Sequence, residues 1–111
     1  MKRCLVNDNE QKQISIASRG LAYGDGLFTT AKIVDGQIEY LPSHMQRLLL
    51  GCEKLGLIPI NSADLTEKLR KVAKPYELAV LKVIVTAGSG GRGYARSSDS
   101  QNDVIITVHD Y

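Results

Sequence analysis

Side chains able to bind an anion gather in two glycine-rich stretches of this 111-residue chain. The first, residues 19–30, combines three glycines, a single aspartate and two adjacent threonines, and Arg47 follows in a segment with helical periodicity. The second is Gly88-Ser-Gly-Gly-Arg-Gly-Tyr94, which carries Arg92. Arginine presents a planar fork of donors that suits a carboxylate or a phosphate. The two stretches therefore predict one wall of a small-molecule site, and we expect the other wall to lie outside this chain.

The spacing Gly88-x-Gly90-x-x-Gly93 matches the fingerprint of dinucleotide-binding loops. That fingerprint works only where a helix begins directly after the glycines, because the helix N-terminus binds the pyrophosphate. Here residues 94–100 have no helical pattern and the next element is a strand, so we reject dinucleotide binding. We interpret the stretch as a loop between strands that presents Arg92 and Tyr94. The alternative is a solvated hairpin tip.

Five other polar residues have a structural explanation beside a chemical one. Lys82 lies in an apolar strand, where a lowered pKa would suit covalent chemistry, but we favour a strand-face lysine whose stem packs and whose ammonium reaches water. His44 is interpreted as a structural hydrogen-bonding residue, and Asp25 as a turn residue that bonds to local backbone. Thr29 and Thr30 point to opposite faces of their strand, so at most one of them reaches a given pocket.

Composition excludes several classes of function. Hydrophobic residues make up 43% and charged residues 23%, which fits one average globular domain. A net charge of +2 without a basic cluster argues against a nucleic-acid surface. Cys4 and Cys52 lack metal-site spacing and are expected to be small buried hydrophobes. The sequence contains no signal peptide and no apolar run of membrane-spanning length, so we expect a cytoplasmic protein.

Strand patterns occupy both ends of the chain. Residues 78–86 form an almost unbroken apolar run, which predicts a central strand buried on both faces. Asp35-Gly36 separates two strand patterns and predicts a hairpin, and residues 87–102 are expected to link the last two strands in a similar way. Residues 18–26, broken by three glycines, are predicted to be a loop. The expected strands are 3–7, 13–17, 27–34, 37–40, 78–86 and 103–109.

Two helices are expected between these strands. Pro42 opens the first and Gly56 closes it in the left-handed conformation. Its buried stripe is expected to contain Met45, Leu48, Leu49, Cys52 and Leu55, with His44 and Arg47 beside it. Asn61 or Ser62 caps the second helix, which ends before Pro75 and has an apolar face of Leu65, Leu69, Val72 and Ala73. This order predicts an α+β domain with a largely antiparallel sheet and two helices on one face.

Three motifs in this order resemble the aminodeoxychorismate lyases. They are Tyr23-Gly-Asp-Gly-Leu-Phe-Thr-Thr-Ala, His44-Met-Gln-Arg47-Leu and Ser89-Gly-Gly-Arg-Gly-Tyr94. These lyases belong to the pyridoxal-phosphate enzymes that include the branched-chain and D-amino-acid aminotransferases. The likeness covers residues 1–111 as a single domain, the smaller N-terminal one of the class IV aminotransferase-like fold. One departure is Ser18, where the family usually has an aspartate.

The resemblance implies roles for particular residues. Arg47, otherwise readable as a surface charge, would bind the phosphate of pyridoxal 5'-phosphate. The substrate would contact Arg92 and Tyr94, with Tyr23 and Thr30 as further candidates. The family's Schiff-base lysine would lie in a second domain beyond Tyr111, so this chain would contain no catalytic residue. We therefore expect the chain alone to be inactive.

The resemblance also implies a reaction for the complete protein. It would convert 4-amino-4-deoxychorismate to 4-aminobenzoate and pyruvate for folate synthesis, act on a small-molecule substrate as a homodimer, and involve neither nucleic acid nor a membrane. Two alternatives stay open from the sequence. One is a domain of a D-amino-acid or branched-chain aminotransferase. The other is a non-catalytic module for ligand binding or dimerisation.

Overall fold

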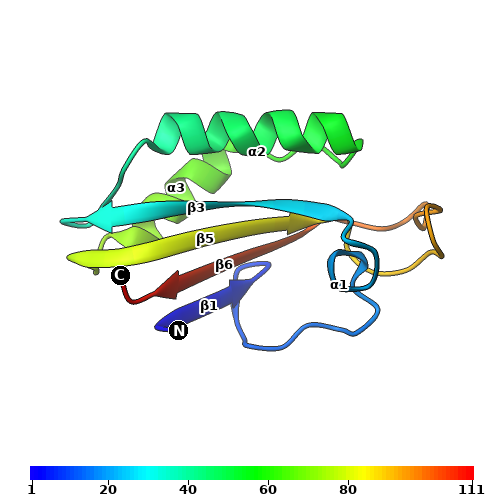
Figure 1. Ribbon diagram of the computed structural model, residues 1–111, viewed down its shortest axis with the longest axis horizontal. Helices are drawn as coiled ribbons and strands as arrows, with labels where there is room; N and C mark the ends of the chain where they lie inside the picture. The colour runs from blue at the N-terminus through cyan, green and yellow to red at the C-terminus, as the bar shows by residue number, and fades with distance from the viewer.

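The computed structural model describes residues 1–111 and contains one six-stranded sheet. Neighbouring strands are antiparallel throughout, in the order β2-β1-β6-β5-β3-β4. Figure 1 shows α2 and α3 on one side of this sheet and the short α1 on the other. The predicted α+β architecture is confirmed. The strands are β1 (Arg3–Val6), β2 (Asn9–Glu10), β3 (Gly26–Val34), β4 (Gln37–Ile38), β5 (Leu78–Thr86) and β6 (Asp103–His109).

Strand β5 lies inside the sheet and pairs along its length with β3 on one side and β6 on the other. The side chains that point toward the helices are almost fully buried, namely Ala79, Leu81, Val83 and Val85. Those on the opposite face, Val80, Lys82 and Ile84, are only half-buried. The prediction of burial on both faces is therefore wrong for the second face, because no helix of this chain covers it along most of β5.

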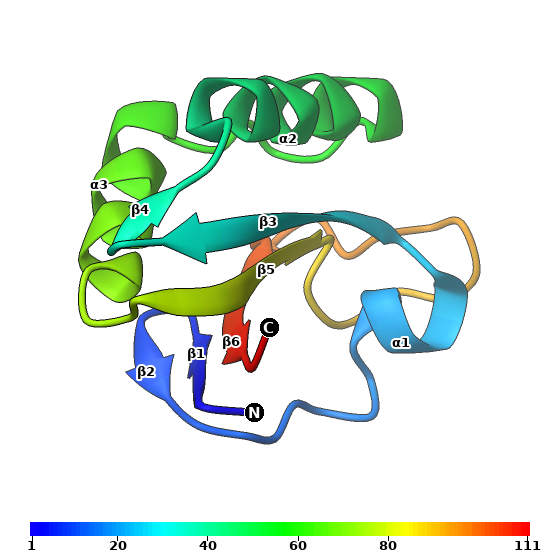
Figure 2. The same ribbon diagram turned by 60° about the vertical axis from the view of Figure 1, so that its left-hand side comes forward.

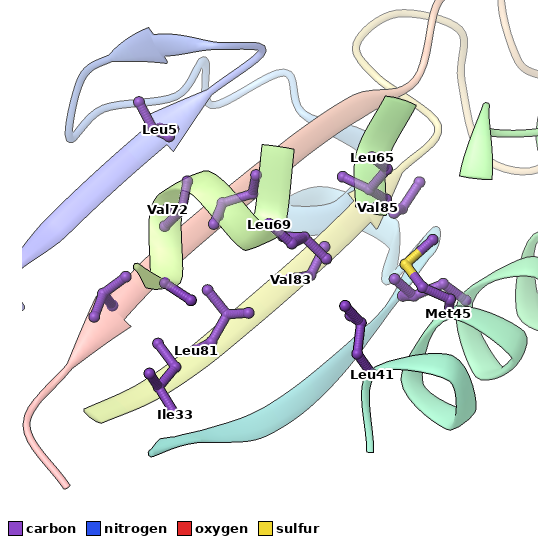
Figure 3. Close-up of a cluster of buried hydrophobic side chains, with 14 of the residues drawn as sticks. Leu5, Ile33, Leu41, Met45, Leu65, Leu69, Val72, Leu81, Val83 and Val85 are labelled. Carbon is purple, nitrogen blue, oxygen red and sulfur yellow. The ribbon is translucent and has the colours of Figure 1, made fainter. Parts of the chain in front are cut away.

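The helices α2 (Leu41–Leu55) and α3 (Ser62–Ala73) cover the first face. Figure 3 shows side chains of both helices and of β5 converging in this core. The buried face of α3 is the predicted one. In α2 the stripe is narrower than expected: Leu49 and Leu55 are 37% and 41% exposed, whereas the first residue of the helix, Leu41, is buried. An α-helix that rests on a sheet buries only the side chains of its contact line, and these two leucines lie beside it.

The predicted end of α2 and the predicted start of α3 are confirmed. Gly56 adopts a φ of 67° and closes α2, as expected for a left-handed C-terminal residue. The side chain of Asn61 accepts a hydrogen bond from the backbone N–H of Asp64 at 3.0 Å, which caps α3. The Asp35-Gly36 hairpin is also present, with φ values of 51° and 75°, the left-handed geometry that a two-residue hairpin requires.

Two predictions in the N-terminal part are wrong. Residues 13–17 form no strand, because Asn7 and Asp8 adopt positive φ and turn the chain at once, so that β2 pairs with β1 at Asn9–Glu10. The predicted loop 18–26 contains a third helix, α1 (Arg19–Tyr23), and β3 already begins at Gly26. The returning strand after the hairpin is shorter than expected, since β4 spans only Gln37–Ile38.

Helix α2 begins at Leu41, one residue before the predicted Pro42. Two further predictions, on the link between the last strands and on the cysteines, agree with the structure. Residues 87–102 connect the antiparallel strands β5 and β6. Cys4 and Cys52 are free and buried, and burial raises the pKa of the Cys52 thiol. None of the helices is long and apolar enough to cross a membrane.

Candidate functional site

The sheet face opposite α2 and α3 is the first part of the candidate site, and we call it the open face. Strand register places Thr30 opposite Lys82, and Phe28 opposite Ile84. Ile84 in turn lies opposite Ile105. Cross-strand partners on one face have Cβ atoms about 5 Å apart, so these side chains form two adjacent rows, one polar and one apolar. Helix α1 lies at one end of this face (Figure 2).

A hollow of about 400 Å³ opens between α1 and the apolar row. Phe28, Ile84 and Ile105 line it from the sheet, and Leu21 lines it from α1. Phe28 remains 52% exposed and Leu21 63% exposed, so the hollow presents apolar surface to solvent. Such a surface suits a flat apolar group of a ligand, with the polar row beside it.

Lysine side chains add positive charge to the open face. The Lys82 ammonium lies 4.6 Å from the centroid of the Phe28 ring, and the Lys32 ammonium lies 4.6 Å from that of Tyr111. The half-buried Lys82 is the strand-face lysine that we favoured from the sequence. Its place beside Thr30 makes it a ligand candidate, which sequence reasoning missed. The sequence pattern was sufficient to find it. Side chains alternate between the two faces of a strand, so Thr30 and Lys82 lie on the same face once β3 pairs with β5.

The predicted substrate residues divide between this face and the loop after β5. Thr30 is exposed on the open face, and Tyr23 is 50% exposed on α1. Arg92 and Tyr94 are exposed on the segment 88–96, which we call the glycine loop. The loop is joined to α1 because Arg19, the first residue of α1, donates from Nη1 to the carbonyl of Gly90 at 3.1 Å.

Arg47 lies on the exposed side of α2 and belongs to the second part of the candidate site. A hollow along this side, the α2 hollow, is lined by Ser43, His44, Gln46, Arg47, Leu50, Gly51 and Lys54. It offers two cationic side chains and a serine hydroxyl, all of them exposed. A phosphate dianion fits this donor set, since guanidinium, ammonium and hydroxyl groups all donate to phosphate oxygens.

His44 connects this hollow to the sheet. Its Nδ1 is hydrogen bonded to Oγ1 of the buried Thr29 at 2.7 Å, which confirms the structural role expected for His44. Burial, and then the charge of Arg47, lower the pKa of His44, so the neutral ring is favoured. Thr29 faces the helices and Thr30 the open face, as expected for neighbours on a strand. The site therefore has one part on each side of β3.

The structure does not bring all predicted residues together. Arg47 lies on the helical side of the sheet, and Thr30 on the other side. β3 separates them, and its outer edge is unpaired over much of its length because β4 pairs only with Ile33 and Val34. The candidate site is thus an incomplete surface on the two sides of one free strand edge.

A buried charge cluster links these parts, and the sequence did not reveal it. Nε of Arg19 donates to Oδ2 of Asp25 at 2.8 Å, and Arg96 donates to both carboxylate oxygens of Asp25, at 2.7 and 2.9 Å. The Arg19 side chain is only 2% exposed. The expectation that Asp25 bonds to local backbone is therefore wrong: its side chain pairs with two arginines, one of them 71 residues away.

The electrostatics of Asp25 follow from this pairing. Hydrogen bonds from Arg96, and then from Arg19, outweigh the effect of burial and lower the pKa of Asp25 from 3.8 to about 2. The carboxylate is therefore ionised at neutral pH. The glycine loop is consequently not a free hairpin tip, because Arg19 and Arg96 attach it to the rest of the domain.

Comparison with known proteins shows which family the chain belongs to. The sequence model described as Amino-transferase class IV matches residues 26–111. An aminodeoxychorismate lyase from Vibrio harveyi is 29% identical over 96% of this chain and 38% of its own length. A D-alanine aminotransferase from Staphylococcus epidermidis is 30% identical over 91% of this chain and 36% of its own.

The chain is also similar in structure to solved proteins. The 4-amino-4-deoxychorismate lyase from Pseudomonas aeruginosa superposes with a TM-score of 0.88 and 36% identity, over 96% of this chain and 39% of that one. The branched-chain amino acid aminotransferase from Escherichia coli superposes with a TM-score of 0.85 over 98% of this chain and 40% of that one; at 20% identity this supports the fold alone. The chain spans about two fifths of the length of these proteins.

Proposed function

Because this chain belongs to the amino-transferase class IV family, we propose that it is a domain of a pyridoxal-phosphate lyase that converts 4-amino-4-deoxychorismate to 4-aminobenzoate and pyruvate. The observation that carries the choice of reaction is the likeness to the P. aeruginosa lyase, at 36% identity and a TM-score of 0.88. The branched-chain aminotransferase of comparable fold is only 20% identical. The D-alanine aminotransferase likeness supports the alternative, a D-amino-acid aminotransferase domain.

In this proposal the α2 hollow holds the cofactor phosphate. Arg47 supplies the fork of donors, and Lys54 and Ser43 lie beside it in the same hollow. When bound, pyridoxal phosphate supplies an electron sink for the reaction. The neutral His44 ring keeps its bond to Thr29 and orients this side of α2 against β3. The contribution of this chain is thus to bind and orient the cofactor.

The open face and the glycine loop would bind the substrate, which carries two carboxylates. Lys82 and Arg92 offer separate cations, and Thr30 and Tyr94 offer hydroxyl groups beside them. The apolar row with Phe28 provides a surface for the substrate ring. Tyr23 on α1 borders the same end of the face. One carboxylate is on the ring and the other is on the side chain that leaves as pyruvate, so two cations at a suitable spacing would be a basis for selectivity.

The proton-transferring lysine would come from the remainder of the protein. Lys82 is assigned to binding, and by the family resemblance no lysine in residues 1–111 stands at the catalytic position. We propose that the chain alone is inactive, and that the complete enzyme works as a cytoplasmic homodimer in folate synthesis.

The lyase and aminotransferase proposals differ in their need for an acceptor. We expect the complete enzyme, given 4-amino-4-deoxychorismate and no keto acid, to release 4-aminobenzoate and pyruvate in equal amounts. Added 2-oxoglutarate should leave the rate unchanged. The 111-residue chain, checked by mass for absence of longer protein, serves as the inactive control. Absence of 4-aminobenzoate, together with transfer of the amino group of a D-amino acid to 2-oxoglutarate, would refute the lyase and support the aminotransferase.

A further inference from the structure

The guanidinium of Arg96 makes contacts in two directions. Nε and Nη2 donate to the two carboxylate oxygens of Asp25, as a bidentate pair. Nη1 donates to the carbonyl of Gly56 at 2.8 Å, and Nη2 also donates to the carbonyl of Leu55 at 2.8 Å. These carbonyls belong to the last turn of α2, where helical partners are missing. One side chain therefore joins the glycine loop to Asp25, directly before β3, and to the end of α2.

The other hydrogen bonds of the loop do not reach α2. Arg19 donates to the carbonyls of Gly90 and Gly93 and so joins the loop to α1. The backbones of Arg92 and Ala95 bond only to each other, at 2.9 Å in both directions. Arg96 thus supplies every hydrogen bond between the glycine loop and α2. Without it, the remaining hydrogen bonds would hold the loop to α1, to Thr86 and to Ser100, but not to α2.

We propose that Arg96, through Asp25, is a positioning residue that sets where the glycine loop presents Arg92 relative to the phosphate-binding side of α2. The inference rests on the proposed function, in which α2 holds the cofactor and Arg92 contacts the substrate. Arg47 lies eight residues before Leu55, about 12 Å along a straight helix. A loop fixed to the end of α2 therefore has a fixed distance from Arg47, whereas a detached loop does not.

This arrangement predicts that a change at Arg96 affects the binding of substrate and the binding of cofactor differently. Loss of Arg96 detaches the loop from α2, so the substrate must order this side of the loop on binding and the KM for substrate rises. Arg47 stays in place because its position depends on α2, and α2 is held by its packing against β3. The affinity for the cofactor should therefore change little. A general loss of stability would weaken both together.

The first test uses the 111-residue chain and does not depend on catalysis. In Arg96→Gln we expect the backbone amides of Arg92 and Ala95 to exchange with solvent at least about tenfold faster than in the wild type, relative to amides of β5. The matched control is Arg70→Gln, which removes a charge from the exposed side of α3. Unchanged exchange at these two amides, or equal acceleration in the control, would overturn the proposal.

The second test uses the complete enzyme. We expect Arg96→Gln to raise the KM for substrate about tenfold, with cofactor affinity within about twofold of the wild type. Arg96→Lys keeps the positive charge but lacks the planar guanidinium. Its KM for substrate should therefore lie between those of the wild type and Arg96→Gln. An unchanged KM, or a parallel loss of cofactor affinity, would overturn the positioning role. If the wild-type enzyme lacks lyase activity, the proposed function fails, while the exchange experiment still decides whether Arg96 orders the loop.

Discussion

Replacing Asp25 with asparagine is expected to lower the free energy of unfolding by about 3 kcal/mol at pH 7. The amide cannot balance the charge of Arg19, whose side chain is 2% exposed, and it breaks the bidentate pair with Arg96. A buried charge left without its partner is costly because it has lost its hydration. Denaturant unfolding at neutral pH measures the effect. Glu67→Gln, which removes a carboxylate from the exposed side of α3, should change stability little.

The same carboxylate predicts an acid dependence. The folded pKa of Asp25, about 2, is lower than its ordinary value of 3.8. The unfolded chain therefore takes up this proton first, so the stabilisation is complete above pH 3.8 and is lost as the pH falls to about 2. A pKa drop of this size corresponds to about 2 kcal/mol. Asp25→Asn should lack this contribution, and an unchanged acid slope in the variant would contradict the assignment.

Replacing Gly88 with alanine is expected to cost about 3 kcal/mol or more. Gly88 has a φ of 78°, and an added Cβ would lie 2.0 Å from the backbone carbonyl oxygen of Gln101. Its own carbonyl accepts a hydrogen bond from the backbone N–H of Arg19 at 2.7 Å, so a shift here would also disturb α1. The three nearest atoms all belong to the backbone of Gln101, so no flexible side chain can move away.

Gly24 provides the matched control. It also has positive φ, at 63°, but an added Cβ would meet nothing within 4 Å. Gly24→Ala should therefore show only the conformational cost, about 1 kcal/mol. Thermal or denaturant unfolding of both variants separates the cost of a positive φ from the cost of the steric clash with Gln101. An equal loss of stability in the two variants would contradict the close approach of Gly88 to the backbone of Gln101.

Local patterns were sufficient for much of the fold. Gly56, Asn61 and the Asp35-Gly36 turn act through neighbouring backbone, so the helix ends and the hairpin could be predicted. Helix α1 could not, because five residues with a glycine show no periodicity and the helix depends on contacts with the glycine loop. The false strand at 13–17 alternated in hydrophobicity but had no partner strand to pair with.

The site was less predictable for the same reason. The motifs identified Arg47, Arg92 and Thr30 as residue types, but their arrangement on two sides of β3 depends on sheet pairing. The partners of Asp25 are a residue six positions away and one 71 positions away. No spacing rule joins such residues, whereas the strand order brings them together. Pairing of β3 with β5 likewise decides that Lys82 shares a face with Thr30.

The central claim is that Arg47 on α2 binds the phosphate of pyridoxal phosphate. The most direct measurement is the affinity of the complete apoenzyme for pyridoxal 5'-phosphate and for pyridoxal, which lacks the phosphate, in the wild type and in Arg47→Ala. We predict that the variant binds pyridoxal phosphate about 100-fold more weakly, because a charge-assisted pair is lost, and binds pyridoxal as the wild type does. Arg70→Ala should match the wild type for both compounds. Equal affinity of wild type and Arg47→Ala for pyridoxal phosphate would contradict the account.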